Sequence, residues 1–364
     1  MATPNPFTAV ERRPHTDGPF HQNEVGLANR NSGILLETLR HDLTPVGLHY
    51  LLNHFDVPYV ADPTWHVEIT GRVKRAGSVS LDEIMRLPAR TLRVTLECAG
   101  NGRAMLTPRY PSVPWGYEAV GTAEWTGAPL RHVLEQAGLL HDATEIACIG
   151  VDSGFDRGQE HYYGRSLQRD VALRDDVLLV WAMNGAPLLP QHGFPLRLVV
   201  PGWYGMASVK WLNRIEALSE PYRGFQQVNS YMYRAVPNGP TTPVTHMRVK
   251  SLMVPPGIPD FYSRRRMVDA GLVQVFGRAW SGGGVPIVRV EFAVDDRWQD
   301  ADLGPEQGRF AWRAWTAGWA AEPGEHELAC RATDASGDTQ PLQLRWDNGG
   351  FGNNAAQRVA VTVR

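Results

Sequence analysis

A Pro-rich, polar stretch, VPNGPTTPVTHM at residues 236–247, is the feature that most constrains the fold of this chain. Proline lacks a backbone hydrogen-bond donor, and a run of mostly polar residues cannot build a packed core. The stretch therefore favours a domain boundary. A chain of 364 residues is also long enough for about two domains. We therefore predict an extended N-terminal arm without a long helix over residues 1–45, a first domain over 46–240 and a second over 241–364.

The first domain mixes short strand and helix patterns. WHVEI at residues 65–69 and TLRVTL at 91–96 alternate apolar and polar positions, which is typical of half-buried strands. Ser80 before LDEIM predicts a capped short helix, and Gly138 predicts the end of a helix over 130–137. Because the order is neither all-β nor a regular βαβ alternation, the pattern predicts an α+β fold.

The second domain has a different sequence pattern, in which strands predominate. VRVEFAV at residues 288–294 alternates strictly, and Leu328, Cys330 and Ala332 share one face of a second predicted strand. Clusters of Ser, Gly and Asp such as ASGD at 335–338 separate these strands. This pattern indicates an all-β sandwich of roughly a hundred residues with Cys330 in its core.

Charge and composition exclude several classes of function. The formal net charge is −2, which disfavours nucleic-acid binding, and three scattered cysteines disfavour a disulfide framework. No apolar run approaches the roughly 20 residues of a membrane span. The N-terminus has no signal-like apolar segment, and none follows Arg12-Arg13. We therefore expect a cytoplasmic protein, or a periplasmic one if a signal has been removed.

The segment LECAGNGR at residues 96–103 is the strongest candidate for chemistry. It puts Cys98 at the end of a predicted strand, next to two glycines that allow a bulky group to approach, with Arg103 five residues on. A nearby cation favours the thiolate, which is the form that binds soft metals. The alternative is a buried cysteine beside an ordinary turn.

A second cluster suits a phosphate group. His192 and Arg197 are followed by Ser208 and Lys210 around glycine-broken strands. Arg and Lys donate charge-assisted hydrogen bonds to phosphate, and glycine exposes the backbone. The alternative is a set of solvated strand ends. No GxGxxG, Walker, HExxH or GxSxG motif is present, which disfavours the commonest dinucleotide, nucleoside triphosphate, zinc-protease and serine-hydrolase functions.

Together these elements resemble the sulfite oxidase family. The resemblance rests on Cys-Ala-Gly-Asn-x-Arg at 98–103, the block at 115–127, the run at 192–212, and AWSGGG with VRVE at 279–291. It implies a mixed α/β molybdopterin-binding domain of the sulfite oxidase fold, followed by an all-β immunoglobulin-like sandwich that forms a homodimer. The implied cofactors are molybdenum and molybdopterin, and we expect no haem domain in this chain.

The resemblance also implies roles for single residues. Cys98 would bind the metal, Tyr222 and Arg103 would act at the substrate, and Trp115 would line the site. The residues that would hold the cofactor are Tyr50, Asn53, His54, Asp152, His192, Arg197, Ser208 and Lys210. The implied activity is oxygen-atom transfer to a small oxyanion, converting sulfite to sulfate, with electrons passing to an external acceptor such as a cytochrome.

Two departures keep other substrates open. Leu52 and Gly349 stand where the family usually has arginine. Each charged hydrogen bond contributes roughly 1.5–3 kcal/mol, so their loss weakens anion binding unless another cation compensates. The candidates for compensation are Arg109, Arg165 and Arg223. The alternatives are reduction of nitrate or an S-oxide by the same cofactor, and, more remotely, a non-catalytic binding protein. The second domain argues against the S-oxide version.

Overall fold

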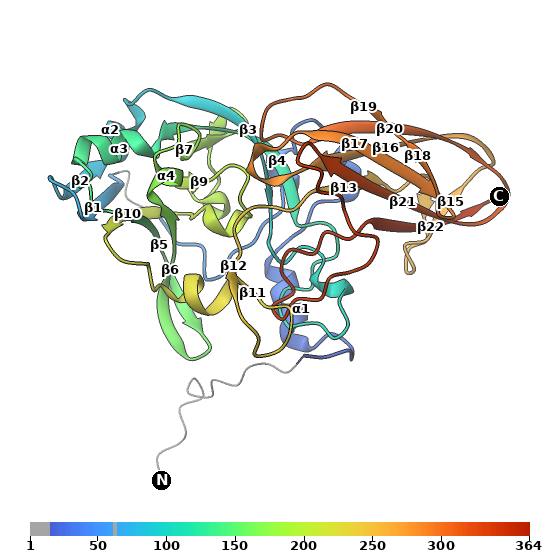
Figure 1. The fold of residues 1–364 in the computed structure, drawn as a ribbon, viewed down its shortest axis with the longest axis horizontal. Coiled ribbons are helices and arrows are strands. Elements are labelled where there is room, and N and C mark those ends of the chain that lie inside the picture. Colours follow the sequence, from blue (N-terminus) through green and yellow to red (C-terminus); the bar gives the residue numbers. More distant parts are fainter. Residues whose placement is uncertain (1–14, 61–63) are drawn as a thin grey trace, which may run out of the picture.

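Two groups of buried apolar side chains organise the chain in this computed structural model, which describes residues 15–60 and 64–364. The larger core belongs mainly to the first domain, and the smaller one fills the sandwich beside it (Figure 1). Trp280, Trp312 and Phe351 of the second domain are buried in the larger core. The two domains therefore share packed apolar surface, which ties their positions together.

The first domain contains two main sheets. One has the order β2-β1-β10-β5-β6, in which only β1 and β10 run parallel; the other has the order β3-β4-β7-β8, with β9 also paired to β7. The strands of the first sheet are β1 (His66–Gly71), β2 (Gly77–Ser80), β5 (Glu145–Asp156), β6 (Gln159–Gln168) and β10 (Leu212–Leu218). Those of the second are β3 (Arg90–Glu97), β4 (Val120–Pro129), β7 (Leu178–Met183), β8 (Ala186–Pro187) and β9 (Arg197–Val199).

The helices are short, and three of the four described α-helices directly follow a strand. They are α1 (Gln22–Arg30), α2 (Leu81–Met85), α3 (Leu130–Ala137) and α4 (Arg169–Ala172). Ser80 accepts a hydrogen bond from Glu83 N at 3.2 Å and caps α2, while Gly138 ends α3 in the left-handed region at φ 73°. Across residues 15–60 and 64–364, no helix combines the length and apolar character needed to cross a membrane.

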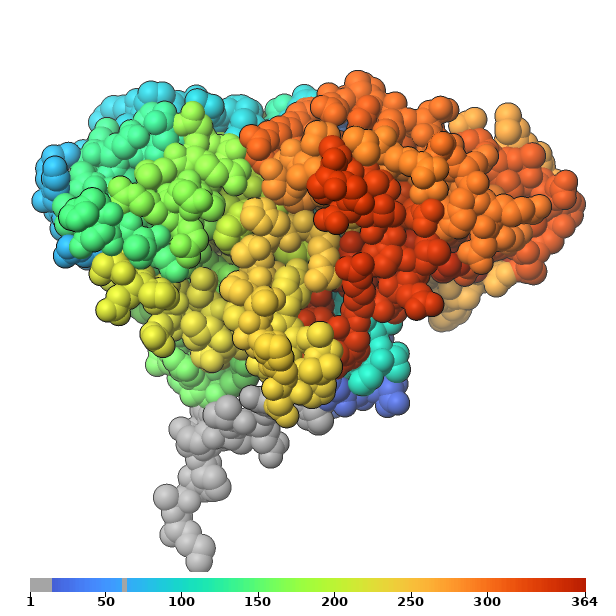
Figure 2. All heavy atoms as spheres, viewed as in Figure 1, coloured from blue at the N-terminus to red at the C-terminus, as the bar shows by residue number. Residues whose placement is uncertain are grey.

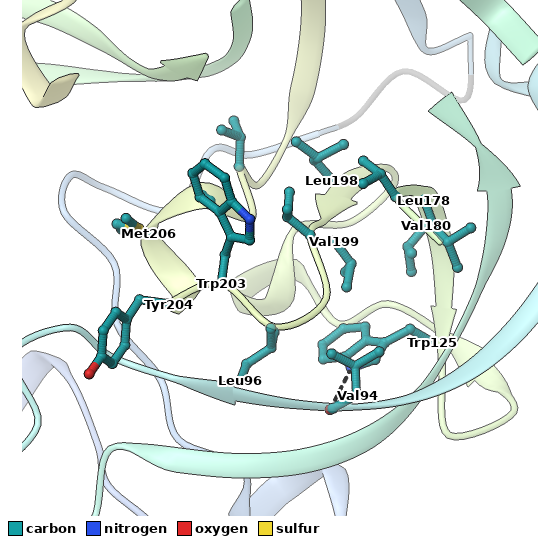
Figure 3. Close-up of a cluster of buried hydrophobic side chains, with 14 of the residues drawn as sticks. Val94, Leu96, Trp125, Leu178, Val180, Leu198, Val199, Trp203, Tyr204 and Met206 are labelled. Atoms are coloured by element: carbon teal, nitrogen blue, oxygen red, sulfur yellow. Dashed lines mark hydrogen bonds between the residues drawn. The ribbon is translucent and has the colours of Figure 1, made fainter. Parts of the chain in front are cut away.

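The core behind the end of β3 is formed by aromatic and aliphatic side chains from four strands and one loop (Figure 3). Leu96 of β3 lies among Trp125 of β4, Val199 of β9 and Trp203 of the following loop, and all are buried. The Trp125 indole donates to the Val94 carbonyl at 3.4 Å. This packing holds the strand that leads directly into Cys98.

The second domain is a sandwich of two antiparallel-rich sheets, which confirms the predicted α+β and immunoglobulin-like architecture. The sheets have the orders β13-β16-β20-β19 and β14-β15-β22-β21-β17-β18. Cys330 is fully buried between them, as the strand pattern predicted. The strands are β13 (Lys250–Val254), β14 (Ile258–Pro259), β15 (Arg266–Val268), β16 (Gly271–Trp280), β17 (Ile287–Val294), β18 (Arg297–Asp300), β19 (Asp302–Leu303), β20 (Arg313–Ala321), β21 (Gly324–Asp334) and β22 (Gln357–Val363). A small ribbon, β11 (Met232–Tyr233) with β12 (Thr242–Pro243), leads from the first domain into the second.

The structure corrects one prediction for the N-terminal arm. Residues 22–30 form the nine-residue helix α1, whereas the sequence indicated only extended chain; residues 1–14, with Arg12-Arg13, lie outside the described residues. Buried Glu24 accepts a local capping hydrogen bond from His21 N and a tertiary one from Arg109 Nη2, both at 2.9 Å, and the tertiary contact is the part that the sequence pattern did not show. Arg109 also donates to the Gly18 carbonyl at 2.8 Å.

This buried pair yields a prediction for stability. Glu24→Gln leaves the Arg109 charge without its carboxylate, and breaking a buried pair from one side typically lowers the free energy of unfolding by about 3–5 kcal/mol. Glu37→Gln, at an exposed position of the same N-terminal arm, serves as the control and should stay within about 0.5 kcal/mol of the wild type. The free energy of unfolding of both variants is measured by urea titration. Equal decreases in the two variants would show that the Glu24–Arg109 pair does not stabilise α1.

Candidate functional site

Cys98 directly follows β3 in a tight, buried turn. Its backbone N–H donates to the Ala119 carbonyl at 2.9 Å, and its carbonyl accepts from Asn101 N at 3.0 Å. Gly102 has φ 94°, and a Cβ there would lie 2.5 Å from the Asn353 amide nitrogen, so the turn requires glycine. Burial raises the pKa of the Cys98 thiol, and nearby Arg103 opposes this without reversing it. Arg103 thus favours the thiolate as expected, but burial outweighs it, so a bound metal would have to displace the proton.

Two adjoining cavities meet at Cys98. The first has a volume of about 60 Å³ and the second about 370 Å³, and Leu52, His54, Cys98 and Tyr231 line both. Of the predicted site residues, Tyr50, Asp152, His192, Arg197, Ser208 and Lys210 line the first cavity, and Asn53, Arg103 and Trp115 line the second. The fold thus brings together residues from positions 50 to 210 of the chain.

The first cavity is rich in buried basic groups. Arg197 donates to the carbonyls of His192 at 2.9 Å and Ser208 at 3.1 Å. Lys210 donates to the Leu52 carbonyl at 2.8 Å and to the Asn53 side chain. Among the described residues that line this cavity, Asp152 carries the only carboxyl group.

Burial leaves these positive charges poorly compensated. It lowers the pKa of Arg197 to about 10 and that of Lys210 well below its usual value. Burial also lowers the pKa of His192 to about 3, with further repulsion from His49 and Arg197, while it raises that of Asp152 to about 7. An anionic ligand would stabilise the positive charges of this cavity. A hydrogen-bond donor on the same ligand would satisfy Asp152 Oδ1, which has no partner.

The second cavity joins Cys98 to a wider, aromatic-lined space. The Tyr231 hydroxyl lies 2.6 Å from His54 Nε2. Arg103 is held in the wall by donating from Nε to the Gly349 carbonyl at 2.9 Å and from Nη1 to the Val113 carbonyl at 3.0 Å. The site therefore combines a thiol, a fixed guanidinium and a Tyr–His pair.

One predicted active-site residue lies elsewhere. Tyr222 is absent from the described linings of both cavities; its ring packs on Gly224, and its hydroxyl lies against Gly164. Its backbone N–H donates to Glu145 Oε2 at 3.0 Å, which holds it over the β5–β6 sheet. Tyr231 lines both cavities, whereas Tyr222 is not among their described lining residues, so its role at the substrate stays a prediction.

The sequence analysis missed several cavity residues. Tyr163 and Tyr231 line the first cavity, and Arg157 lines the second from the turn between β5 and β6. Tyr231 follows a π-helical turn, Gln226–Ser230, and its carbonyl accepts from Val244 N at 3.0 Å. Tyr222 and Tyr233 lie close to Tyr231 in the sequence, so the sequence did not show which tyrosine lines the cavity. The DRG sequence around Arg157 is typical of a turn, and this signal could have indicated an arginine there.

Comparison with known proteins identifies the family. Residues 54–226 match the family described as "Oxidoreductase molybdopterin binding domain", and residues 241–364 match "Mo-co oxidoreductase dimerisation domain". The chain is 34% identical to the mitochondrial sulfite oxidase of Mus musculus over 88% of this chain and 62% of that protein. The chain belongs to the sulfite oxidase family of molybdopterin-dependent oxidoreductases.

Other members of the family are equally similar. An NAD(P)H nitrate reductase of Hordeum vulgare is 34% identical over 88% of this chain and 39% of that protein, so the chain spans about two fifths of its length. The sulfane dehydrogenase SoxCD of Paracoccus pantotrophus has the same fold, with a TM-score of 0.78 at 23% identity over 96% of this chain and 93% of that one.

The residues present fit the family's cofactor. The basic groups of the first cavity, with Arg197 and Lys210 lacking a full anionic partner, suit a pterin phosphate, and Asp152 and His49 offer unpartnered polar atoms. Cys98, at the junction of the cavities, offers one soft thiolate to molybdenum. The basic groups of the first cavity would thus hold the phosphate end of the cofactor, and the wider second cavity beside Cys98 would admit a substrate.

Buried His49 predicts loss of stability in acid. Its pKa is lowered to about 4 by burial, so the folded protein keeps it neutral while the unfolded chain binds a proton below about pH 6.5. The resulting stability is present above pH 6.5 and lost as the pH falls toward 4, amounting to about 2 kcal/mol at pH 5.

The test compares unfolding free energies of cofactor-free protein at pH 7 and pH 5. His49→Gln should reduce the pH-dependent loss by about 2 kcal/mol. His141→Gln, at an exposed histidine, should leave it unchanged. An unaltered pH dependence in the His49 variant would contradict the assignment.

Proposed function

We propose that this protein oxidises sulfite to sulfate at the cavity beside Cys98 and passes the two electrons to a separate acceptor. In this reaction sulfite gains an oxygen that originates from water, and two protons and two electrons leave. Molybdenum bound by Cys98 and molybdopterin supplies the two-electron chemistry. The observation that carries the proposal is the presence of Cys98, Arg103 and Tyr231 in one cavity with a net positive lining.

The positive lining would bind the oxyanion. Arg103 is fixed by two backbone carbonyls and so needs little reorganisation when an anion binds. Of the three sequence candidates for compensation, Arg109 is paired with Glu24, Arg165 donates to the Gln226 carbonyl at 2.6 Å, and Arg223 is exposed. None of the three is among the described residues that line the second cavity, whereas Arg157 is.

The Tyr231–His54 pair would orient the substrate and hold its protons. Burial lowers the pKa of His54 to about 3 and raises that of Tyr231 well above its usual value. Both groups therefore stay neutral at pH 7, and the hydroxyl donates to the ring nitrogen when the His54 proton is on Nδ1. A hydroxyl in this position can exchange that hydrogen bond for one to a substrate oxygen.

Nitrate reduction is the second candidate. A nitrate reductase and a sulfite oxidase match this chain at the same identity, 34%. Leu52 and Gly349 give the second cavity fewer cations than the arginines usual in the family would, and the Gly349 carbonyl accepts a hydrogen bond from Arg103. A thinner set of positive charges suits the singly charged nitrate better than the doubly charged sulfite.

The wider assembly is also part of the proposal. The match to a dimerisation domain supports a homodimer formed through residues 241–364. We further propose an external electron acceptor such as a cytochrome. A cytoplasmic location, or a periplasmic one after removal of a signal, completes the proposal.

A visible spectrum distinguishes the two substrates. The protein is purified aerobically from a host that makes molybdopterin, and sulfite is added without oxygen. A thiolate-to-molybdenum band that bleaches supports sulfite oxidation. A band that persists with sulfite, but is restored by nitrate after chemical reduction, supports the second candidate. Cys98→Ala should lack the thiolate-to-molybdenum band, whereas Cys148→Ala, at a buried strand position, should retain it.

Arg157 provides a test of substrate binding. Arg157→Gln removes one charge from the second cavity, and because a charged hydrogen bond contributes roughly 1.5–3 kcal/mol, we expect KM to rise about 10- to 100-fold with little change in kcat. Steady-state kinetics of Arg223→Gln, at an exposed position outside the described linings, provides the control. Matching KM values for the two variants would remove Arg157 from the substrate site.

A further inference from the structure

A buried ion pair joins the second domain to the residue before Cys98. Lys250 Nζ lies 2.5 Å from Glu97 Oε1, and the exposed fractions of the two side chains are 3% and 1%. Lys250 opens β13 of the sandwich, while Glu97 ends β3 of the first domain. The pair is therefore an interdomain contact at the base of the Cys98 turn.

Neutral donors complete the coordination of this carboxylate. Glu97 Oε1 also accepts from Asn101 Nδ2, and Oε2 accepts from the Trp280 indole, both at 3.0 Å. Lys250 and Trp280 are direct partners in the β13–β16 ladder, so one register position of the sandwich supplies two of the three donors. Asn101 in turn accepts from Ala119 N at 3.1 Å, which extends the network around the turn.

Further contacts from the second domain hold the rest of the turn. Gly352 N donates to the Ala99 carbonyl at 2.7 Å, and the Asn353 amide donates to the Gly102 carbonyl at 2.9 Å. These contacts come from the C-terminal segment, drawn in red, which lies against the yellow stretch near residue 240 in the space-filling view (Figure 2). The conformation of residues 98–103 thus depends on both domains.

The charges make Lys250 more than a structural contact. A metal-bound Cys98 thiolate would add negative charge one residue from the Glu97 carboxylate, inside a space where charges are weakly screened. Lys250 is the cation paired with that carboxylate among the described residues. Without it, Glu97 would present an unbalanced buried charge beside the thiolate.

We propose that Lys250 of the second domain is a positioning residue for the molybdenum thiolate, because it holds and neutralises Glu97 beneath Cys98. Through this pair the sandwich sets both the conformation of the Cys98 turn and the electron density at its sulfur. The inference rests on the proposed cofactor site at Cys98 and is independent of which oxyanion is the substrate.

The test uses Lys250→Met, Glu97→Gln and the double variant in the full-length holoprotein. Two readouts are compared: the energy of the thiolate-to-molybdenum band and the Mo(VI)/Mo(V) midpoint potential from a redox titration followed by electron paramagnetic resonance. Lys250→Met leaves Glu97 unbalanced and should shift the equilibrium at least about tenfold toward Mo(VI), which is about 59 mV for one electron. Glu97→Gln should shift it the opposite way, and the double variant should return toward the wild type.

Trp280→Phe separates charge from structure. It removes one donor to Glu97 but keeps both charges, so the potential should stay near that of the wild type even if the protein is less stable. If Lys250→Met does not fold, the opposite shift in Glu97→Gln still tests the charge effect. Unchanged band energies and potentials in variants that retain molybdenum would overturn the inference. Absence of molybdenum from the wild type would instead refute the proposed cofactor site.

Discussion

The Glu97–Lys250 pair is the interaction on which the geometry of the site most depends. It lies at the one place where the end of β3, the Cys98 turn and the first strand of the sandwich meet. A buried carboxylate of this kind is stable only when its lone pairs are satisfied, and here both domains and the turn itself provide the donors. The conformation of the Cys98 turn therefore depends on contacts from both domains.

The first cavity has the opposite charge arrangement, because its buried charges are not neutralised within the protein. There the protein buries Arg197 and Lys210, and Asp152 is the single carboxyl group among the described lining residues, so an anionic ligand would improve the charge balance. Such a cavity favours an anion over any neutral molecule of the same size. The Glu97 charge next to Cys98 is neutralised within the protein, whereas Arg197 and Lys210 in the first cavity have no ion-pair partner among the described residues.

The substrate side follows from what replaced the missing arginines. Gly349 contributes a carbonyl that fixes Arg103, and Arg157 of the β5–β6 turn, which is ion-paired with Asp156, lines the same cavity. A cation supplied by a turn can be exchanged without altering the sheets. This separation between cofactor residues on packed elements and a substrate residue on a turn explains how similar folds can serve different oxyanions.

The sequence by itself determined the α+β first domain, the β-sandwich, the capped helix after Ser80 and the family, because alternation, capping and the Cys98 turn are local patterns. Only the tertiary structure decided that α1 forms, that Tyr231 rather than Tyr222 reaches the cavity, and that Glu97 pairs with Lys250. The contacts concerned join residues far apart in the sequence: Glu24 and Arg109 are 85 positions apart, His54 and Tyr231 are 177 apart, and Glu97 and Lys250 are 153 apart. Contacts over such separations leave no periodic signal in a single sequence, since they arise from burial in a core that several elements build together.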